Sequence, residues 1–242
     1  MLFRSVKVQK IVFKKKQKPK VELYFESRPF NNRDRIFWSS YGISKQNLID
    51  DKVFPIRKYL MRNTKNGHIK KRVYDIGYAY TDFQNNRKKM YFPYREGKRR
   101  FISTCNKNDI GGIENLPQTG ERVIITKSYK DYRVLKNQGL ECIWIQNEGM
   151  IPDKEVLIPI IQGYSDIIIW YDNDTPGKEA SIKMVDFINS ILKGKCRSVC
   201  LSEELLNKHI KDPSDLIKHS KEKLTEFIDS YVKGNRPFLG PY

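Results

Sequence analysis

Two carboxylates, Asp172 and Asp174, lie one residue apart after an apolar run at residues 167–171. Such a run of β-branched and aromatic residues, ended by turn residues, is typical of a buried strand. At an extended strand tip, residues two apart lie on the same side. Two anionic oxygen ligands without a neighbouring histidine or cysteine suit a hard cation such as Mg²⁺. The alternative is a simple turn, because Asp, Asn, Pro and Gly are all favoured in turns.

Further acidic residues follow the other apolar segments of the second half of the chain. Asp131 comes after residues 123–126, Glu148 after residues 142–145, and Asp212 further along. Open α/β sheets place their ligands at the carboxyl ends of the strands. Acids that converge on one sheet edge are costly unless a cation neutralises them, so the pattern indicates a cation at this edge.

Alternating short strands and helices predict a parallel sheet in the second half, and hence an α/β fold class. Gly139 is expected to end the first of these helices. The expected strands span residues 123–126, 142–145, 167–171 and 198–201. The expected helices span residues 132–137, 156–161 and 178–192, with a final helix after residues 211–217 that runs through Phe227 and Tyr231.

The formal net charge of +18 belongs entirely to the first half of the chain. Residues 1–120 contain 28 Lys and Arg against 10 Asp and Glu, whereas residues 121–242 contain 18 of each. A strongly basic part beside a neutral one indicates that a polyanion-binding region adjoins a second functional region. The expected division is a basic N-terminal subdomain at 1–118, a second domain at 119–232 and a C-terminal tail at 233–242.

The basic subdomain is expected to mix strands and helices. Its expected elements are strands within residues 5–26 interrupted by a lysine-rich loop at 14–20, two helices within 35–60 separated by Gly42 with Ser44 as the second N-cap, a polar loop at 62–67, and an antiparallel meander over 74–101.

Basic residues cluster at the turns of the expected meander. Arg and Lys contact phosphates, whereas Tyr and Phe stack on bases, a grip that tolerates any sequence of a single strand. For the tyrosines, burial in the core is the favoured alternative. The residues expected to contact nucleic acid are Lys88, Lys89, Arg95, Lys98, Arg99 and Arg100.

Cysteine and histidine content argues against a structural zinc site. The four cysteines are scattered without a Cys-x-x-Cys pair, and three histidines are too few and too dispersed. We expect reduced cysteines and a cytoplasmic protein. No apolar run approaches the ~18 residues that span a bilayer, so no membrane partner is expected.

The acidic motif and its surroundings resemble the Toprim domain, a metal-binding fold shared by bacterial and phage primases, type IA and II topoisomerases and some nucleases. Residues 172–177 (Asp-Asn-Asp-Thr-Pro-Gly) resemble the family's Asp-x-Asp-x-x-Gly motif, and residues 211–215 resemble the Asp-Pro-x-Asp segment of DnaG-type primases. Residues 91–98 are similar to the strand and turn before Toprim in those primases, and residues 112–117 resemble their Gly-x-x-x-Leu-Pro join. The resemblance covers about residues 70–232 and favours the primase branch.

One position departs from the family. Its first motif is Glu-Gly-x-x-Asp after a strand, whereas the matching residues 126–131 keep Asp131 but place Lys127 at the Glu position. Three accounts are open. Glu148 supplies the missing carboxylate, Lys127 binds a triphosphate or template phosphate, or the site is impaired and the chain only binds nucleic acid. We favour an active, divergent phage-type variant.

The resemblance implies a DNA primase core that makes short RNA primers on single-stranded DNA from ribonucleoside triphosphates. The implied cofactor is Mg²⁺ or Mn²⁺, which would position the triphosphate and lower the pKa of the attacking 3′-hydroxyl. The alternatives are a Toprim nuclease and a non-catalytic accessory protein that binds single-stranded DNA. The implied roles are metal ligation by Asp131, Asp172, Asp174 and Asp212, catalysis by Asp131, Glu148 and Lys127, and nucleotide-phosphate binding by Lys127 and Lys130.

The resemblance also implies partners. Such primases usually carry a zinc ribbon in front and a helicase or helicase-binding segment behind, and neither is recognised in this sequence. We expect a stand-alone core or a fragment, working with a replicative helicase and a separate zinc-binding module in the cytoplasm, or in the host cytoplasm if the chain is phage-encoded.

Overall fold

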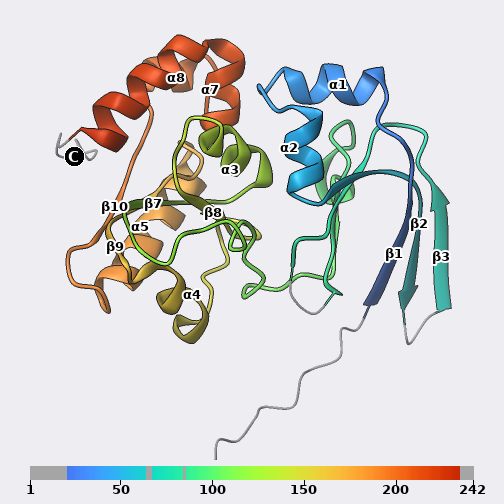
Figure 1. Cartoon of the computed structure of the whole chain (residues 1–242), viewed down its shortest axis with the longest axis horizontal. Coiled ribbons are helices and arrows are strands. Elements are labelled where there is room, and N and C mark those ends of the chain that lie inside the picture. The colour runs from blue at the N-terminus through green and yellow to red at the C-terminus, as the bar shows by residue number, and fades with distance from the viewer. Residues whose placement is uncertain (1–20, 64–66, 84–85, 235–242) are drawn as a thin grey trace, which may run out of the picture.

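The computed structural model describes residues 21–63, 67–83 and 86–234, except for the side chains of residues 63–70. The strand and lysine-rich loop expected within residues 5–20 lie outside this description. Figure 1 shows an antiparallel sheet with helices α1 and α2 on the N-terminal side, and a parallel sheet with the later helices on the C-terminal side.

An antiparallel sheet forms the described N-terminal part. β1 pairs with β2, β2 pairs with both β3 and β4, and β4, β5 and β6 continue as a meander. The predictions of a strand at 21–25 and of a meander within 74–101 are therefore confirmed. The strands are β1 Val21–Ser27, β2 Val53–Asn63, β3 Gly67–Arg72, β4 Tyr78–Tyr80, β5 Lys89–Tyr91 and β6 Phe101–Ser103.

The prediction of two helices within residues 35–60 is only partly right. Helix α1 spans Asn32–Ser39 and α2 spans Lys45–Asp50. Ser44 caps α2 as expected, since its hydroxyl accepts a hydrogen bond from the Asn47 N–H at 3.1 Å. The chain after α2 is not helical, because it enters β2 at Val53.

Pro55 gives the physical reason for this correction. A proline in a helix interior removes a backbone donor and collides with the preceding turn, which disfavours a helix without forbidding one, as Pro159 inside the helix Lys154–Ile161 shows. Here the residues around Pro55 also find pairing partners in β4. β2 continues to Asn63 and β3 begins at Gly67, so the two ends of the loop expected at 62–67 belong to strands.

The second half forms a parallel sheet in the order β10-β9-β7-β8. Its strands are β7 Gly120–Thr126, β8 Cys142–Trp144, β9 Tyr164–Ile169 and β10 Cys196–Ser198. The helices are α3 Tyr129–Lys136, α4 Lys154–Ile161, α5 Thr175–Asn189, α6 Glu203–Asn207, α7 Pro213–His219 and α8 Lys221–Phe227, which continues as a π-helical turn Ile228–Lys233.

Several predicted boundaries are corrected. Helix α3 begins three residues earlier than expected, because the Ser128 hydroxyl caps it by accepting from the Asp131 N–H at 3.2 Å. The expected final helix is two helices, since Ser220 adopts an extended conformation, ends α7 and caps α8. The strand expected at 198–201 is β10 at Cys196–Ser198, and α6 was not expected.

Helices cover both faces of the parallel sheet. Ile124 and Ile168 pack in the cluster that contains the buried residues of α3, α7 and α8. The alternate residues of the same strands, such as Ile125 and Ile169, pack in the cluster that contains those of α4 and α5. The predicted α/β fold with a parallel sheet flanked by helices, after a basic mixed α/β part, is therefore confirmed.

Aromatic side chains join the two sheets. The ring centroid of Tyr80 in β4 lies 4.9 Å from that of Tyr129 in α3, and Trp38 of α1 lies 5.8 Å from the same ring. Tyr78 and Tyr91 are also buried in this cluster, so the core alternative for these tyrosines is correct. Within the described residues, no helix is both long and apolar enough to cross a membrane.

Candidate active site at the strand ends

Lys127, Glu148 and Asp172 meet where three neighbouring strands end. β7 lies between β8 and β9, so the carboxyl ends of all three strands lie at one edge of the sheet. The Lys127 ammonium forms an ion pair with Asp172 Oδ2 and lies 3.5 Å from Glu148 Oε2. The structure thus brings a cation and two carboxylates together at the edge where the sequence indicated an acidic site.

Charge and burial compete at this edge. Burial works against the charge on Lys127, but nearby carboxylates, above all Asp172 and Asp131, outweigh it and raise the pKa of Lys127. Burial raises the pKa of Asp172, and the charge of Lys127 offsets only part of that effect. Lys127 is therefore firmly cationic, whereas the Asp172 carboxylate is ionised at a cost.

Two buried carboxylate oxygens at this edge, Asp172 Oδ1 and Glu148 Oε2, accept no hydrogen bond from the described residues. Carboxylate oxygens of this kind are the ligands that a hard cation prefers. In the described parts of the chain, however, no three Asp, Glu, His or Cys side chains gather closely enough to hold a metal ion. Mg²⁺ commonly takes one or two carboxylates together with water and substrate phosphates. The residues therefore fit one ion shared with a substrate, and not a set of ions held by protein alone.

Asp131 has a different environment, although the sequence grouped it with Asp172. It is 1% exposed. Its Oδ2 accepts a hydrogen bond from the Ser128 hydroxyl at 2.6 Å, and its Oδ1 accepts from both the N–H, at 3.2 Å, and the hydroxyl of Ser214. Because Ser214 lies in the first turn of α7, the Asp131 carboxylate connects α3 to α7.

Asp174 begins helix α5. Its Oδ1 accepts a hydrogen bond from the Gly177 N–H at 3.1 Å, and its Oδ2 pairs with Lys211 at 2.9 Å. Burial raises the pKa of Asp174, but the bonds from Lys211 and Gly177 outweigh burial and hold this pKa below its usual range. A side chain at Gly177 would collide with the Asp172 carbonyl, which explains the glycine in this motif. Asp174 therefore has a local structural role as the N-cap of α5, which is a helix start and not the simple turn of the alternative interpretation.

Asp212 and Lys130 lie together beside α7. Asp212 caps α7 by accepting from the Asp215 N–H at 2.7 Å, and burial together with the charge of Asp131 raises the pKa of Asp212. Burial opposes the charge on Lys130, but the charge of Asp212 together with other neighbours, including Asp131, outweighs burial and raises the pKa of Lys130. The Lys130 ammonium lies 4.6 Å from the ring centroid of Tyr41.

A cavity of about 510 Å³ lies between the strand ends and the antiparallel sheet. Its volume falls within the range of small-ligand sites, about 300–1,000 Å³. Lys127, Glu148 and Asp172 line it from the parallel sheet, and Arg100 and Phe101 line it from the antiparallel sheet. The cavity therefore combines fixed charges of both signs with an aromatic surface.

Lys89 is buried, although the sequence placed it among exposed DNA contacts. It is 7% exposed, and its ammonium donates to the Gln146 carbonyl at 2.6 Å. The same ammonium lies 5.0 Å from the ring centroid of Phe101 and 5.4 Å from that of Trp144. Burial lowers the pKa of Lys89 to about 8. Lys89 lines the strand-end cavity from the junction of the two sheets.

The remaining basic candidates do not form one surface. Arg100 lines the strand-end cavity, and the Lys88 ammonium donates to Asn86 Oδ1 at 2.7 Å. Tyr94, which is 70% exposed, lines a separate hollow of about 640 Å³ on the antiparallel sheet. That hollow also contains three of the basic candidates, namely Arg95, Lys98 and Arg99.

Lys211 and Ser214 contact the predicted site residues but were not identified from the sequence. Lys211 forms an ion pair with Asp174, and Ser214 donates a hydrogen bond to an oxygen of Asp131. A signal was available, because both residues flank Asp212 in the segment that resembles the primase Asp-Pro motif. A short polar segment at a helix N-terminus directs its side chains and N–H groups toward neighbouring acids.

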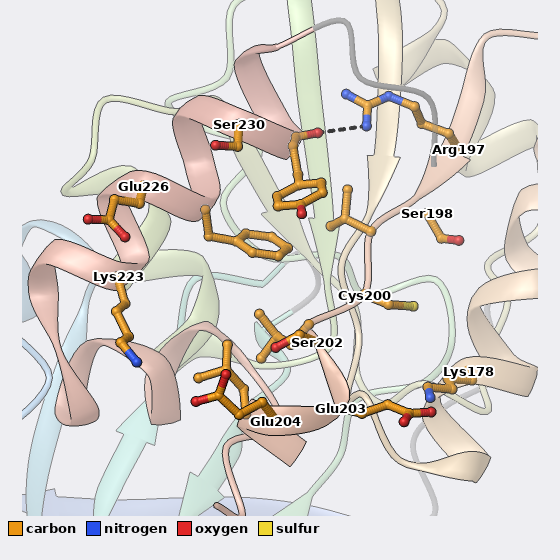
Figure 2. A pocket seen from close by; sticks show the side chains of 15 residues that line it. Lys178, Arg197, Ser198, Cys200, Ser202, Glu203, Glu204, Lys223, Glu226 and Ser230 are labelled. Carbon is orange, nitrogen blue, oxygen red and sulfur yellow. Dashed lines mark hydrogen bonds between the residues drawn. The ribbon is translucent and has the colours of Figure 1, made fainter. Parts of the chain in front are cut away.

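A second cavity, of about 530 Å³, lies between the chain after β10, helix α6 and helix α8 (Figure 2). Arg197 donates to the Tyr231 carbonyl at 2.9 Å across one end of it. The lining residues include none of Lys127, Glu148 and Asp172. This cavity is therefore separate from the strand-end site.

No protein-family model matches the sequence, and no curated protein is significantly similar to it. Solved structures of primases are similar in fold. The primase fragment of the bacteriophage T7 primase-helicase matches with a TM-score of 0.54 and 15% identity, over 78% of this chain and 70% of that one. The zinc-binding and RNA polymerase domains of the Aquifex aeolicus primase match with a TM-score of 0.60 and 15% identity, over 83% and 56%.

The catalytic domain of a DnaG primase bound to single-stranded DNA matches with a TM-score of 0.53 and 14% identity, over 86% of this chain and 66% of that one. At these identities the likeness concerns the fold, and the chain spans 56% of the length of the Aquifex structure. The predicted resemblance to the catalytic cores of DnaG-type primases is confirmed at the level of structure.

Proposed function

We propose that the chain is the catalytic core of a DNA primase that synthesises short RNA primers on single-stranded DNA. The observation that carries this proposal is the strand-end cavity, in which Lys127, Glu148 and Asp172 face residues of the basic sheet. Its volume suits a nucleotide, and its charges suit a triphosphate beside a hard cation. The similarity in fold to primase cores supports the same function.

The proposed chemistry is positioning and charge stabilisation. Asp172 and Glu148 would hold Mg²⁺ or Mn²⁺, which supplies charge neutralisation at the triphosphate and a lower pKa for the attacking 3′-hydroxyl. Lys127 and Arg100 neutralise phosphate charge from the cavity wall. Asp131, Asp174 and Asp212 keep α3, α5 and α7 in place around the cavity, a role supported by their contacts.

The basic first half would hold the template. We assign residues 1–118 to single-stranded DNA binding, 119–232 to catalysis and 233–242 to a tail. Lys98 and Arg99, which are exposed, would contact backbone phosphates without reading sequence. The T7 protein is a primase-helicase and the Aquifex primase has a zinc-binding domain, which supports a replicative helicase and a separate zinc module as partners of this chain. We place the chain in the cytoplasm. The likeness to a bacteriophage protein supports a phage origin.

The test is a template-directed synthesis assay. The full chain receives single-stranded DNA and labelled ribonucleotides with Mg²⁺ or Mn²⁺, beside Asp172→Asn and a matched control, Asp186→Asn, which changes an exposed aspartate of α5. We expect short template-dependent RNA from the wild type and from the control but not from Asp172→Asn. Salt-sensitive DNA binding without product would reject catalysis in favour of a binding protein, and template degradation would select a nuclease.

A further inference from the structure

Lys127 lies where the strand-end acids converge. Its ammonium contacts Asp172 Oδ2 and lies 3.5 Å from Glu148 Oε2, and these two acids follow the strands on either side of β7. Lys211, which also lies near this edge, pairs with Asp174 at 2.9 Å instead. Lys127 is therefore placed between two carboxylates, a position in which a bound metal ion would also be stable.

A structural ion pair would be expected to use the carboxylate oxygens fully. At this edge Asp172 Oδ1 and Glu148 Oε2 accept no hydrogen bond from the described residues, although both are buried. The contrast with Asp131, whose two oxygens both accept hydrogen bonds, is direct. The cluster thus has one fixed positive charge, a free acceptor at Asp172 Oδ1 and only a long ion pair of 3.5 Å at Glu148 Oε2, so the ammonium neutralises the two acids only in part.

A fixed positive charge also changes what the cluster can bind. Two like charges about 4 Å apart repel strongly when both are shielded from water. A divalent ion that approached Asp172 would meet the Lys127 ammonium on the same carboxylate. The lysine therefore supplies part of the positive charge that a triphosphate needs and lowers the affinity of the carboxylates for metal.

We propose that the Lys127 ammonium is a tethered cation that takes the place of one divalent ion among the strand-end carboxylates. Its meaning for catalysis rests on the proposed primase function, but the site itself can be tested without any activity. The proposal explains why a lysine stands beside two partly buried acids at the carboxyl ends of the strands.

The experiment measures binding of Mn²⁺ alone to the full chain, from the electron paramagnetic resonance signal of the free ion. Lys127→Met removes the charge but keeps an unbranched side chain. The matched control is Lys136→Met, because Lys136 is buried to a similar extent, at 18% against 19% side-chain exposure, and pairs with Glu141 at 2.8 Å away from the site. We expect Lys127→Met to bind Mn²⁺ at least ten times more tightly than the wild type and than Lys136→Met.

A double variant locates the effect. Adding Asp172→Asn to Lys127→Met should abolish the gain in Mn²⁺ affinity. If Lys127→Met does not fold, as judged by circular dichroism, Lys127→Gln replaces it with the same expectation. An unchanged or weaker affinity without the ammonium would overturn the proposal, and so would an equal gain in Lys136→Met. A gain in affinity together with a wild type that makes no primers would keep the tethered cation and reject the primase.

Discussion

Two aspartates, one in each half of the molecule, pair with a cationic side chain in different ways. Asp34 in α1 is 1% exposed, and its Oδ1 accepts from Arg28 at 2.9 Å and from the Tyr78 hydroxyl at 2.8 Å. Its Oδ2 also accepts from Arg28 and from the Asn31 N–H at 2.8 Å. Asp172 keeps one oxygen on Lys127 and leaves the other without a hydrogen bond from the described residues.

The pKa directions follow this difference. Burial raises the pKa of Asp34, but hydrogen bonds from Arg28 and Asn31 outweigh it and hold the value below its usual range. Burial raises the pKa of Asp172, and Lys127 does not fully compensate. Asp34 therefore stabilises the fold as an ion, whereas Asp172 is kept as an ion at the expense of stability. A fully satisfied buried charge indicates architecture, and a partly satisfied one at a strand end indicates a ligand site.

The largest expected effect on the free energy of unfolding is at Asp34, whose carboxylate oxygens all accept hydrogen bonds. Asp34→Asn should lower the free energy of unfolding by about 3 kcal/mol, because it leaves the Arg28 guanidinium partly buried without its counter-charge. Denaturant unfolding measures the change, and Asp50→Asn, at an exposed aspartate of α2, is the control. A loss no greater than that of the control would mean that the network around Asp34 is not architectural.

A charge buried without an acid partner should show its cost in a pH dependence. Lys89 has a pKa of about 8 in the folded chain, because burial disfavours its ammonium, against about 10.4 in the unfolded chain. At Lys89 the unfolded state binds more protons above pH 8, so the contribution of this residue to the free energy of unfolding should rise with pH. We expect this contribution to grow by about 2 kcal/mol between pH 7.5 and 9.5, against the opposite contribution of the buried cysteine thiols, whose pKa burial raises.

The free energy of unfolding of the wild type relative to Lys89→Met should therefore rise over this pH range, whereas relative to Lys183→Met, at an exposed lysine of α5, it should stay constant. Urea unfolding at a series of pH values gives the comparison. A slope that is the same in all three proteins would assign the pH dependence to other groups. A fall in the stability of the wild type relative to Lys89→Met over the same pH range would contradict the depressed pKa of Lys89.

Exposed charges complete the comparison, because they should affect binding and not folding. Replacing Lys98 and Arg99 by alanine should weaken single-stranded DNA binding several-fold and leave unfolding unchanged. The slope of log affinity against log salt should become shallower by about 0.7 for each phosphate that the variant no longer neutralises. Fluorescence anisotropy at several salt concentrations measures it, with Lys183→Ala as the control. An unchanged slope would remove these two residues from the DNA surface.

The sequence predicted the elements that periodicity and turn residues define. The strand ending before Asp172, the cap at Ser44 and the parallel sheet all depend on local patterns, which is why they were found. The strand β2 was missed because its apolar residues also fit a helical pattern, and Pro55 was the overlooked contrary signal. Boundaries such as the start of α3 depend on a single cap hydrogen bond.

The candidate site was predictable as a set of strand ends but not as a set of contacts. Strand order places Lys127 between the acids that follow β8 and β9, and that order is a tertiary property. Spacing alone could not show that Asp131 accepts a hydrogen bond from Ser214, which is distant in the sequence. Nor could it show that Lys89 points into the junction of the two sheets. Partner identity decides whether an acid serves structure or chemistry, and partners come from distant segments.

The smallest expected effect is the most informative one. Asp172→Asn should change the free energy of unfolding by less than about 1 kcal/mol, or raise it slightly, because a carboxyl group whose pKa is raised by folding destabilises the fold when ionised. Asparagine keeps the shape and an acceptor for Lys127, which also retains Glu148 at 3.5 Å. The same denaturant series used for Asp34→Asn gives the measurement. A loss close to that of Asp34→Asn would make Asp172 a second architectural charge, and the strand-end acids would then need a different explanation. A near-zero change together with lost primer synthesis would show that the two aspartates differ in role. Asp34→Asn would then affect stability, and Asp172→Asn would affect function.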